Sequence, residues 1–559
     1  MAAEALHHLG WEAEVRPHGK RIEAIAIYTL DVFDARDPVP QFVNALHVTS
    51  RDYVIRRELL FEVGEVWSKQ RVEETERNLR GLRQLSLANV VVAKGAQAGA
   101  VRLVVVTKDV WSLRLNSNIG FGGDGLQYLL LNPAEENLAG THSSLGILYL
   151  LDPFRHVAGL RYVQPRLGGS RYWVAAQAAL IANRDTGAIE GSSGQFVFEL
   201  PQFSLRSPFA YGTRVAWLDE VSRRTVGTRL RSFDYLLASG ETESVPWQYR
   251  TERLAAEYFG VLSTGVLRKT DLSFGIEAEQ RNYRRVAETG FQAATLAAFD
   301  AQVLPVSDRR MGPFLQIRSY EGRFHRVLDL ELLGLQEDYR LGYDLMTRVF
   351  VASESVGSSR DLVGAVAGAS YTWPLGTGLA RFAAQGRGVV ASLDRNEAAM
   401  TVGARLVSPL TGPGRLHLDA DVDFRFENYL NLPPFTLGGS GRLRGFPANQ
   451  FQGNNLVVAN LEYRTRSIDV LSAQLGLAAF YDVGDAPDSF SNLSLHHDVG
   501  MGLRILFPQA DRAVLRLDYG FPLDVDVSNR SGAFYLTFGQ AFGLPGLSTP
   551  SVTSGVSAF

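Results

Sequence analysis

Apolar and charged positions alternate through most of the chain after Trp111. The segment RLHLDADVDFRF, residues 415–426, is the clearest case. One face of this segment would carry Leu416, Leu418, Ala420, Val422, Phe424 and Phe426. The other face would carry Arg415, His417, Asp419, Asp421, Asp423 and Arg425. Because successive side chains of a strand point to opposite faces, and unpaired charges do not pack into a dry core, the pattern predicts a strand with one apolar face and one wet face.

The same alternation returns in NLVVANLEYRTR, residues 455–466, and in DRAVLRLDYG, residues 511–520. A soluble sandwich also has a wet and a dry face, but these strands are long and the pattern recurs over too many residues for one sandwich. At about 27 residues per strand with its connection, residues 111–542 give about 16 antiparallel strands. We therefore expect an all-β transmembrane barrel, with its apolar face toward lipid and its charged face toward a wet lumen.

Residues 20–110 have a mixed pattern. The stretch RIEAIAIYTL predicts a strand, and SRDYVIRRELLFEVGEVW predicts a helix and a turn. A second helix is expected in SKQRVEETERNLRGLRQL, with Ser68 as its cap. Two strands, LANVVVAKG and AVRLVVVTKDVW, complete the order β-α-α-β-β. This order predicts a small N-terminal α+β domain, preceded by a lead segment, residues 1–19.

Composition removes several classes of protein. The apolar fraction of 46% excludes general disorder, and the 56 basic and 59 acidic residues give no bulk charge for a nucleic-acid partner. The absence of Cys excludes zinc–thiolate sites, thiol nucleophiles and disulfides. We find no apolar run long enough for a transmembrane helix. The first residues lack the features of a secretory signal, so an exported form would need a signal upstream of this sequence.

The stretch GGSGRLRGFPANQ, residues 438–450, interrupts the alternation with four glycines and two arginines. A phosphate-binding loop would require Lys-Ser/Thr and a following helix, which this stretch lacks. Its RLRGFPANQ part resembles the VRGF/Y loop of the BamA/TamA superfamily of outer-membrane assembly factors, the bacterial surface antigen family. In that loop the chain folds back into the barrel. Arg444, Gly445 and Phe446 match the motif, and Leu443 stands in place of the usual Val.

Further motifs extend the resemblance over nearly the whole chain. FYDVG, residues 480–484, is similar to the family's FxDxG motif and contains Asp482 and Gly484, while Glu462 falls where the family places a lumenal acid. EENLAGTH, residues 135–142, resembles the first barrel hairpin. GAFYLTFGQAF resembles the terminal strand, so Phe538 and Phe542 are expected at the barrel closure, against the strand before EENLAGTH. The N-terminal domain resembles one POTRA module.

The resemblance implies an outer-membrane protein with its N-terminal domain in the periplasm. Its partners would be the lipid bilayer and unfolded outer-membrane or secreted polypeptides, which the POTRA domain would capture. It would insert barrels, or move polypeptides across the membrane, through a lateral seam and without a nucleotide. Alternatives are a two-partner-type secretion pore and a passive porin or structural surface barrel. In the loop, Arg444 would pair with Asp482 or Glu462 in partly solvated surroundings.

Catalysis has little support in the sequence, and we expect neither an enzyme nor a cofactor. None of the ten His lies in an HExxH motif. The His pairs at residues 7–8 and 496–497 have no ligand spacing, so we expect no functional metal site. Residues 543–559 follow the predicted closing strand, lack alternation and are expected to form a flexible tail.

Overall fold

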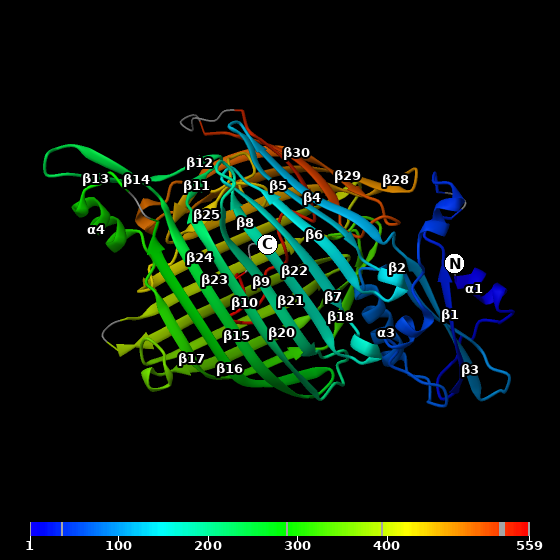
Figure 1. Ribbon diagram of the computed structural model, residues 1–559. Helices are drawn as coiled ribbons and strands as arrows, with labels where there is room; N and C mark the ends of the chain where they lie inside the picture. The colour runs from blue at the N-terminus through cyan, green and yellow to red at the C-terminus, as the bar shows by residue number, and fades with distance from the viewer. Residues whose placement is uncertain (1, 35–36, 287–288, 393–394, 525–530, 557–559) are drawn as a thin grey trace.

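The computed structural model describes residues 2–34, 37–286, 289–392, 395–524 and 531–556. These residues form a small N-terminal domain and a closed antiparallel barrel, and the domain lies at one end of the barrel (Figure 1). We call this end of the barrel proximal and the opposite end distal. None of the helices in the described residues is long and apolar enough to span a membrane.

The barrel consists of twenty strands, with β27 and β28 counted as one because they pair in succession with β29. Every neighbouring pair is antiparallel, and each strand follows the previous one in the chain around the wall. The strands are β4 (Leu113–Gly122), β5 (Gly125–Glu135), β6 (Ser144–Leu151), β7 (Arg155–Gln164), β8 (Trp173–Asn183), β9 (Ile189–Leu200), β10 (Phe209–Arg223), β15 (Gln248–Thr264), β16 (Arg268–Arg285), β17 (Asp308–Glu321), β20 (Gly342–Ala352), β21 (Leu362–Leu375), β22 (Gly378–Ala391), β23 (Glu397–Val407), β24 (Gly414–Asn428), β27 (Leu456–Thr465), β28 (Ile468–Val470), β29 (Ala473–Asp485), β30 (His496–Leu506), β31 (Leu515–Pro522) and β32 (Ala533–Phe538).

The predicted barrel is confirmed, but the predicted number of about 16 strands is wrong. The assumed spacing between strands was too long, because several connections are tight turns. For example, β4 ends at Gly122 and β5 begins at Gly125, and β21 ends at Leu375 and β22 begins at Gly378. Sequence alternation continues through such turns with little interruption, so the alternating pattern does not show where one strand ends and the next begins.

Longer connections carry small elements of their own. At the distal end these are the strands β11 (Thr225–Val226), β12 (Arg229–Leu230), β13 (Ser232–Leu236), β14 (Thr242–Pro246), β25 (Phe435–Leu437) and β26 (Phe451–Gly453), and the helix α4 (Ala293–Gln302). At the proximal end, β18 (Phe324–Leu328) and β19 (Gln336–Arg340) form a hairpin between β17 and β20. We call residues 322–341 the proximal hairpin.

The barrel closes between β32 and β4, one strand earlier than the expected partner, which was the strand before EENLAGTH. Only Phe534 to Leu536 pair with residues 119–121 across this closure. Phe538 is the last residue of β32, and its N–H donates to Asn118 Oδ1 at 2.9 Å. Phe542 does not take part in the closure, because the chain leaves the wall at Gly539, whose φ is +94°.

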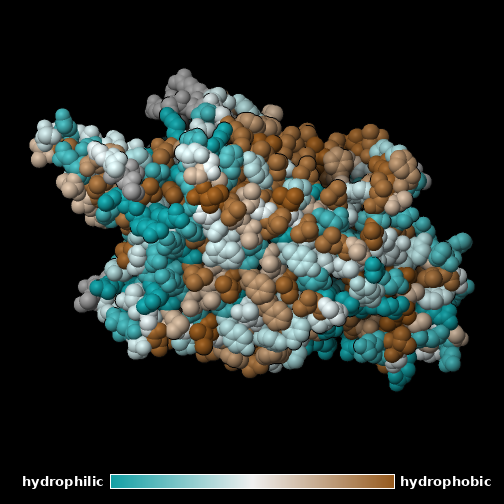
Figure 2. Space-filling view, in the orientation of Figure 1, coloured by the Kyte–Doolittle hydropathy of each residue, from teal (hydrophilic) through white to brown (hydrophobic). Residues whose placement is uncertain are grey.

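The two faces of the wall differ as the alternation predicts. On β24, the outward Leu418 is 43% exposed, whereas the inward His417 and Asp419 are buried. Figure 2 shows apolar residues over the barrel wall and hydrophilic residues on the N-terminal domain and on the loops at the distal end. At the level of His417 the inner face is not wet, because polypeptide segments from both mouths fill the lumen there.

The N-terminal domain has a three-stranded sheet in the order β1-β3-β2, with β1 (Arg21–Leu30) parallel to β3 (Ala100–Asp109) and β2 (Leu85–Lys94) antiparallel to it. Its helices are α1 (Ala2–His8), α2 (Asp52–Arg56) and α3 (Lys69–Gly81). The Ser68 side chain caps α3, as predicted, whereas α2 is shorter than expected. A small apolar core, which includes Ile55, Leu79 and Leu103, lies between α3 and the sheet.

The N-terminal domain docks on the proximal mouth through specific contacts. The EENLAGTH stretch forms the turn between β5 and β6, and its Gly140 carbonyl accepts a hydrogen bond from Arg51 N at 3.0 Å. Ser50 Oγ lies 2.7 Å from His142 Nε2 in the same turn. Arg80 of α3 pairs with Asp338 of the proximal hairpin at 2.8 Å. The domain is therefore attached both to the wall and to a hairpin that enters the lumen.

Two substitutions on β24 test which face of the barrel wall points to lipid and which points to the lumen. Leu418→Arg places a charge on the outer surface of β24 and should cost about 2 to 4 kcal/mol at the midplane of a bilayer. Asp421→Asn, on the inner face, only weakens a partly exposed ion pair with Arg442 and should cost about 1 kcal/mol or less. Urea unfolding in lipid vesicles, followed by gel mobility without heating, measures both. Equal costs would contradict the assignment of the faces.

Candidate functional site

The loop between β24 and β27 folds into the barrel from the distal mouth. We call residues 429–455 the lumenal loop. A two-stranded sheet of β25 and β26 closes its base, and the stretch with Arg444 lies between these strands. Leu443, Arg444 and Phe446 are all 0% exposed. The glycine-rich stretch therefore contacts its own barrel, as the resemblance implies.

Arg444 contacts carboxylates of three different strands. Its Nε and Nη2 lie 2.8 and 2.9 Å from the two oxygens of Asp482, a two-pronged contact. Its Nη1 lies 2.7 Å from Glu462 Oε2 and 3.3 Å from Asp518 Oδ2. The guanidinium also stacks on Phe480, 3.4 Å from the ring centroid. A single loop residue thus joins β27, β29 and β31.

Two glycines allow this close approach of loop and wall. A Cβ on Gly445 would lie 2.6 Å from Asp498 Cβ, and a Cβ on Gly520 would lie 2.5 Å from the backbone carbon of Arg444. Both distances are shorter than real Cβ contacts, so side chains at these positions would push the loop away from the wall. Gly445 N also donates to Asp498 Oδ2 at 2.9 Å.

Phe446 connects the lumenal loop to the closing strand. Its ring packs edge-on against Phe451 at 5.2 Å, and its carbonyl accepts a hydrogen bond from Tyr535 Oη at 3.2 Å. Tyr535 lies on β32. On the other side of the closure, Gln127 of β5 accepts a hydrogen bond from Ala448 N at 3.1 Å. The loop therefore contacts strands on both sides of the closure from inside the barrel.

The carboxylates around Arg444 have further arginine partners. Glu462 Oε1 lies 2.7 Å from Arg464 Nε and 3.0 Å from Arg504 Nη2. Arg504 and Arg516 both bind Asp518, Arg516 at 2.9 Å. The result is a network of buried cations and anions in which each charge lies beside an opposite one. Such a network is costly to interrupt, because removal of one member leaves its neighbours buried and unpaired.

The proximal hairpin enters this network from the other mouth. Glu331, between β18 and β19, binds Arg405 at 2.6 Å and Arg464 at 3.5 Å. Arg405 in turn binds Asp419 of β24 at 2.5 Å. Segments from both mouths thus meet in the lumen at shared ion pairs.

The structure brings together all six residues predicted for the loop contact. Gly484 lies at the base of the loop, where an added Cβ would be 3.0 Å from Leu437 of β25. Sequence reasoning missed Asp498, Asp518, Arg504 and Glu331. The alternation in DRAVLRLDYG does place Asp518 on the inner face, but no local signal indicates which inward charges meet across the barrel.

Electrostatics keep Arg444 charged. Burial alone would lower the pKa of Arg444, but the charges of Asp482 and Glu462 raise this pKa well above its usual value. In the part of the chain that the structure describes, no group of three or more His, Asp or Glu side chains is arranged to hold a metal ion. The arrangement is suited to holding a loop in place.

A double-mutant cycle measures this contact. Arg444→Ala leaves Asp482 buried without its two-pronged partner and should cost about 3 to 5 kcal/mol of unfolding free energy, more than the partly solvated pair that we expected from sequence. Arg444→Lys should restore only part of this, because an ammonium lacks the fork of donors. A cycle with Asp482→Ala, read by urea unfolding, gives the coupling energy.

The neighbouring Arg442 is a matched control for this cycle. Its side chain is 25% exposed and pairs with Asp421, so Arg442→Ala should cost about 1 kcal/mol or less. A coupling energy of zero between Arg444 and Asp482 would mean that other contacts hold the loop.

The known proteins similar to this chain over most of its length are solved structures. No curated protein matches the chain. Among solved structures, BamA from Haemophilus ducreyi lacking POTRA domains 1–3 is similar over 93% of this chain and 85% of its own, at 12% identity and a TM-score of 0.37. CdiB from Acinetobacter baumannii is similar over 93% and 74%, at 11% identity and a TM-score of 0.39. CdiB from Escherichia coli is similar over 93% and 77%, at 12% identity and a TM-score of 0.43.

A family comparison matches residues 430–542 to the Omp85 superfamily domain. The match begins in the lumenal loop, ends at Phe542 and contains every residue predicted for the loop contact. The predicted resemblance is confirmed for this part of the chain: residues 430–542, which form the last part of the barrel, match the Omp85 superfamily domain.

Proposed function

We propose that this protein inserts β-barrel clients into the outer membrane through a lateral seam between β32 and β4. The observation that carries the proposal is the short ladder at this closure. Three residue pairs join β32 to β4, whereas sixteen join β15 to β16. Among the described residues, and with β27 and β28 taken together as one strand, no other pair of neighbouring barrel strands has so few. An edge with unpaired backbone groups is costly in lipid, so it readily accepts a new strand.

The lumenal loop supports a controlled opening of this seam. Phe446 and Ala448 bind Tyr535 and Gln127, on the two sides of the closure. The ion pairs of Arg444 fix the loop to β27, β29 and β31, which lie to one side of the seam. Opening the seam would break these two hydrogen bonds, the short ladder and the hydrogen bond from Phe538 N to Asn118. It would also break the hydrogen bonds of Ala448 and Gln452 with residues 225–227, while the ion pairs of Arg444 would stay intact.

The N-terminal domain would act as a POTRA module in the periplasm and capture unfolded clients. Its sheet has two edges, β1 and β2. Part of the β2 edge is occupied, because Glu14 N donates to the Val92 carbonyl and Lys94 N donates to the Glu12 carbonyl. The start of the β1 edge is also occupied, because Ile22 N donates to the Glu65 carbonyl and the Ile22 carbonyl accepts from Gly64 N. An extended client would therefore add to β1 beyond Ile22, through main-chain hydrogen bonds that do not depend on its sequence.

A two-partner-type secretion pore is the second candidate. The observation that favours it is an extended polypeptide segment, residues 543–556, which lies in the lumen of this barrel. In this case clients would cross through the lumen, and the seam would stay closed.

A disulfide across the seam separates the two candidates. Cysteines at Leu536 and Ile119, which are paired across the closure, should form the only disulfide, because the chain has no Cys of its own. We expect the oxidised protein to be folded but unable to insert an unfolded barrel client into vesicles, and reduction to restore insertion. A matched control joins β30 to β31 through Met501→Cys and Tyr519→Cys.

The outcomes of this experiment distinguish a lateral gate from a secretion pore. Loss of insertion in the seam pair alone supports the lateral gate. Full insertion with the seam oxidised contradicts it, and secretion that continues in that state favours the second candidate.

Photo-cross-linking tests client capture by the N-terminal domain. A cross-linking side chain at Ile27, on the β1 edge, should trap unfolded clients in cells. The same side chain at Val92, on the occupied part of the β2 edge, should trap far fewer. Equal yields at the two positions would contradict capture by strand addition at β1.

A further inference from the structure

The segment after the last strand lies inside the barrel. In Figure 1 residues 543–556 appear as the red trace in the middle of the barrel, near the label C. The segment has no helix or strand of its own and only one turn, at residues 552–555. It follows the inner wall from β23, where Arg405 binds it, toward β7, whose Val157 belongs to the same apolar cluster as Val552 and Val556. We call it the lumenal segment.

Arginines of the wall bind the main chain of this segment. Arg405 Nη2 donates to the carbonyls of Phe542 and Gly543, both at 2.9 Å. Arg348 Nη1 donates to the Pro550 carbonyl at 2.9 Å, and Arg253 Nη1 donates to the Gly555 carbonyl at 2.9 Å. Every polypeptide carries such carbonyls, so these contacts recognise an extended chain without reading its side chains.

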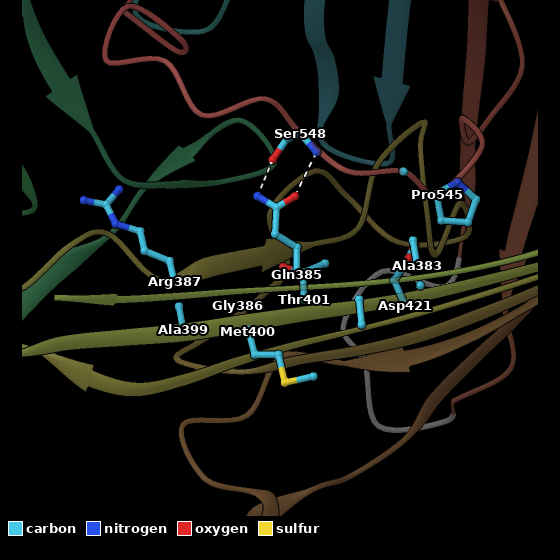
Figure 3. Close-up of a pocket in the computed structure, with 13 residues that line it drawn as sticks. Ala383, Gln385, Gly386, Arg387, Ala399, Met400, Thr401, Asp421, Pro545 and Ser548 are labelled. Carbon is cyan, nitrogen blue, oxygen red and sulfur yellow. Dashed lines mark hydrogen bonds between the residues drawn. The ribbon is translucent and has the colours of Figure 1, made fainter. Parts of the chain in front are cut away.

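Three side-chain contacts lie between these arginines, one of them from Arg318 Nη1 to Thr549 Oγ1 at 3.4 Å. Gln385 on β22 faces Ser548, donating to its hydroxyl and accepting from its N–H, each at 2.9 Å (Figure 3). Farther along, Ser551 Oγ donates to Glu257 Oε2 at 2.6 Å. These contacts suit small, hydroxyl-bearing residues.

Apolar residues anchor the segment along its course. Leu547 packs beside Gly368 of β21, where an added Cβ would be 2.8 Å from it. Val552 and Val556 are 4% and 0% exposed and join an apolar cluster on the wall with Ile181 and Leu218. Residues 547–556 of the segment are therefore docked on the wall, in contrast to the flexible tail that we expected from the sequence.

The charges of the wall do not depend on the lumenal segment. Arg405 keeps Asp419 at 2.5 Å, Arg253 keeps Glu279 at 2.8 Å, and Arg348 keeps Glu257 at 3.3 Å. Residues 543–556 include no charged side chain. If the segment leaves, each arginine stays paired and water replaces the lost carbonyl. This differs from the lumenal loop, whose departure would strand Asp482 without its arginine.

Two cavities lie along the segment, one beside its first half and one beside its second half. A cavity of about 340 Å³ is lined by residues 383–387 of β22 and by Pro545, Gly546 and Ser548 (Figure 3). Another, of about 440 Å³, is lined by Trp173, Arg214 and residues 549–555 of the segment, among others. Since the segment forms part of both linings, its removal would enlarge both spaces along the inner wall.

We propose that the inner wall from β23 to β7 is a binding site for an extended, uncharged polypeptide, and that the lumenal segment is its tethered occupant. The site offers donors for main-chain carbonyls, a contact for a small hydroxyl residue and an apolar end. An occupant without charge leaves the ion pairs of the wall intact when it departs. While bound, it closes the lumen. This site is separate from the seam, and the inference holds whether the protein inserts or secretes its clients.

A reversible disulfide in the full chain provides the first test. A Cβ on Gly403 would lie 2.8 Å from Pro545 Cβ, and a shift to the roughly 3.8 Å of a disulfide is small. We expect the reduced Gly403→Cys/Pro545→Cys protein to show voltage-driven channel openings in a planar bilayer, and the oxidised protein to lose them. The control pair, Met501→Cys with Tyr519→Cys on the outer face, should open equally in both states. Equal open probability of the oxidised and reduced Gly403/Pro545 pair would overturn the proposal.

The second test asks whether the vacated wall binds a peptide. Val552→Asp with Val556→Asp should release the end of the segment and raise the conductance of the full chain. A synthetic peptide of residues 543–556, at roughly millimolar concentration to replace a tethered occupant, should lower the conductance again. The same peptide with Asp at both valine positions should not. Gel mobility without heating confirms that each variant is folded.

The outcomes separate closure from binding. Either negative result, a disulfide pair indifferent to oxidation or conductance that does not rise in the Val552/Val556 variant, rules out the segment as the closure. Conductance that rises but does not respond to the peptide rules out a polypeptide-binding site on the wall. If both peptides lower the conductance equally, the apolar cluster around Val552 and Val556 does not contribute to the choice of the bound peptide.

Discussion

The lumen of this barrel is organised by the need of buried charges for a partner. Arg444 enters from the distal mouth and meets Asp482 and Glu462, while Glu331 enters from the proximal mouth and meets Arg405 and Arg464. Withdrawal of the lumenal loop would leave Asp482 buried without its arginine, which is strongly unfavourable. Withdrawal of the proximal hairpin would leave Arg405 and Arg464 with one carboxylate each, Asp419 and Glu462. The constraint therefore fixes the lumenal loop most strongly inside the wall. The seam and the lumenal segment are then the parts of the barrel whose contacts can break without that cost.

Much of this arrangement follows from local sequence. Side chains alternate along a strand with a period of two, so the stretch at residues 415–426 is sufficient to predict an outer and an inner face. The loop that enters the barrel and the strand that it meets are predicted only by the resemblance of the motifs around Arg444 and Asp482 to those of a known family. The strand count could not be predicted in the same way, because tight turns such as the one after Gly122 leave little trace in an alternating pattern.

Other features depend on contacts between distant parts of the chain. Asp518 and Glu331 join the network because the barrel brings β31 and the proximal hairpin beside β27, and alternation alone does not show this. The lumenal segment is a stronger case. Its small, uncharged residues have the composition of a flexible linker, and only the arginines of the wall distinguish a docked segment from a mobile one.

The proximal hairpin has a mechanical consequence. Its Asp338 is bound to Arg80 of the N-terminal domain, and its Glu331 is bound to Arg405, the residue that also holds the carbonyls of Phe542 and Gly543. A tilt of the domain that preserves the Arg80 ion pair must therefore pull on Arg405. A force on the sheet of the N-terminal domain is therefore transmitted through the proximal hairpin to Phe542 and Gly543, where the lumenal segment begins.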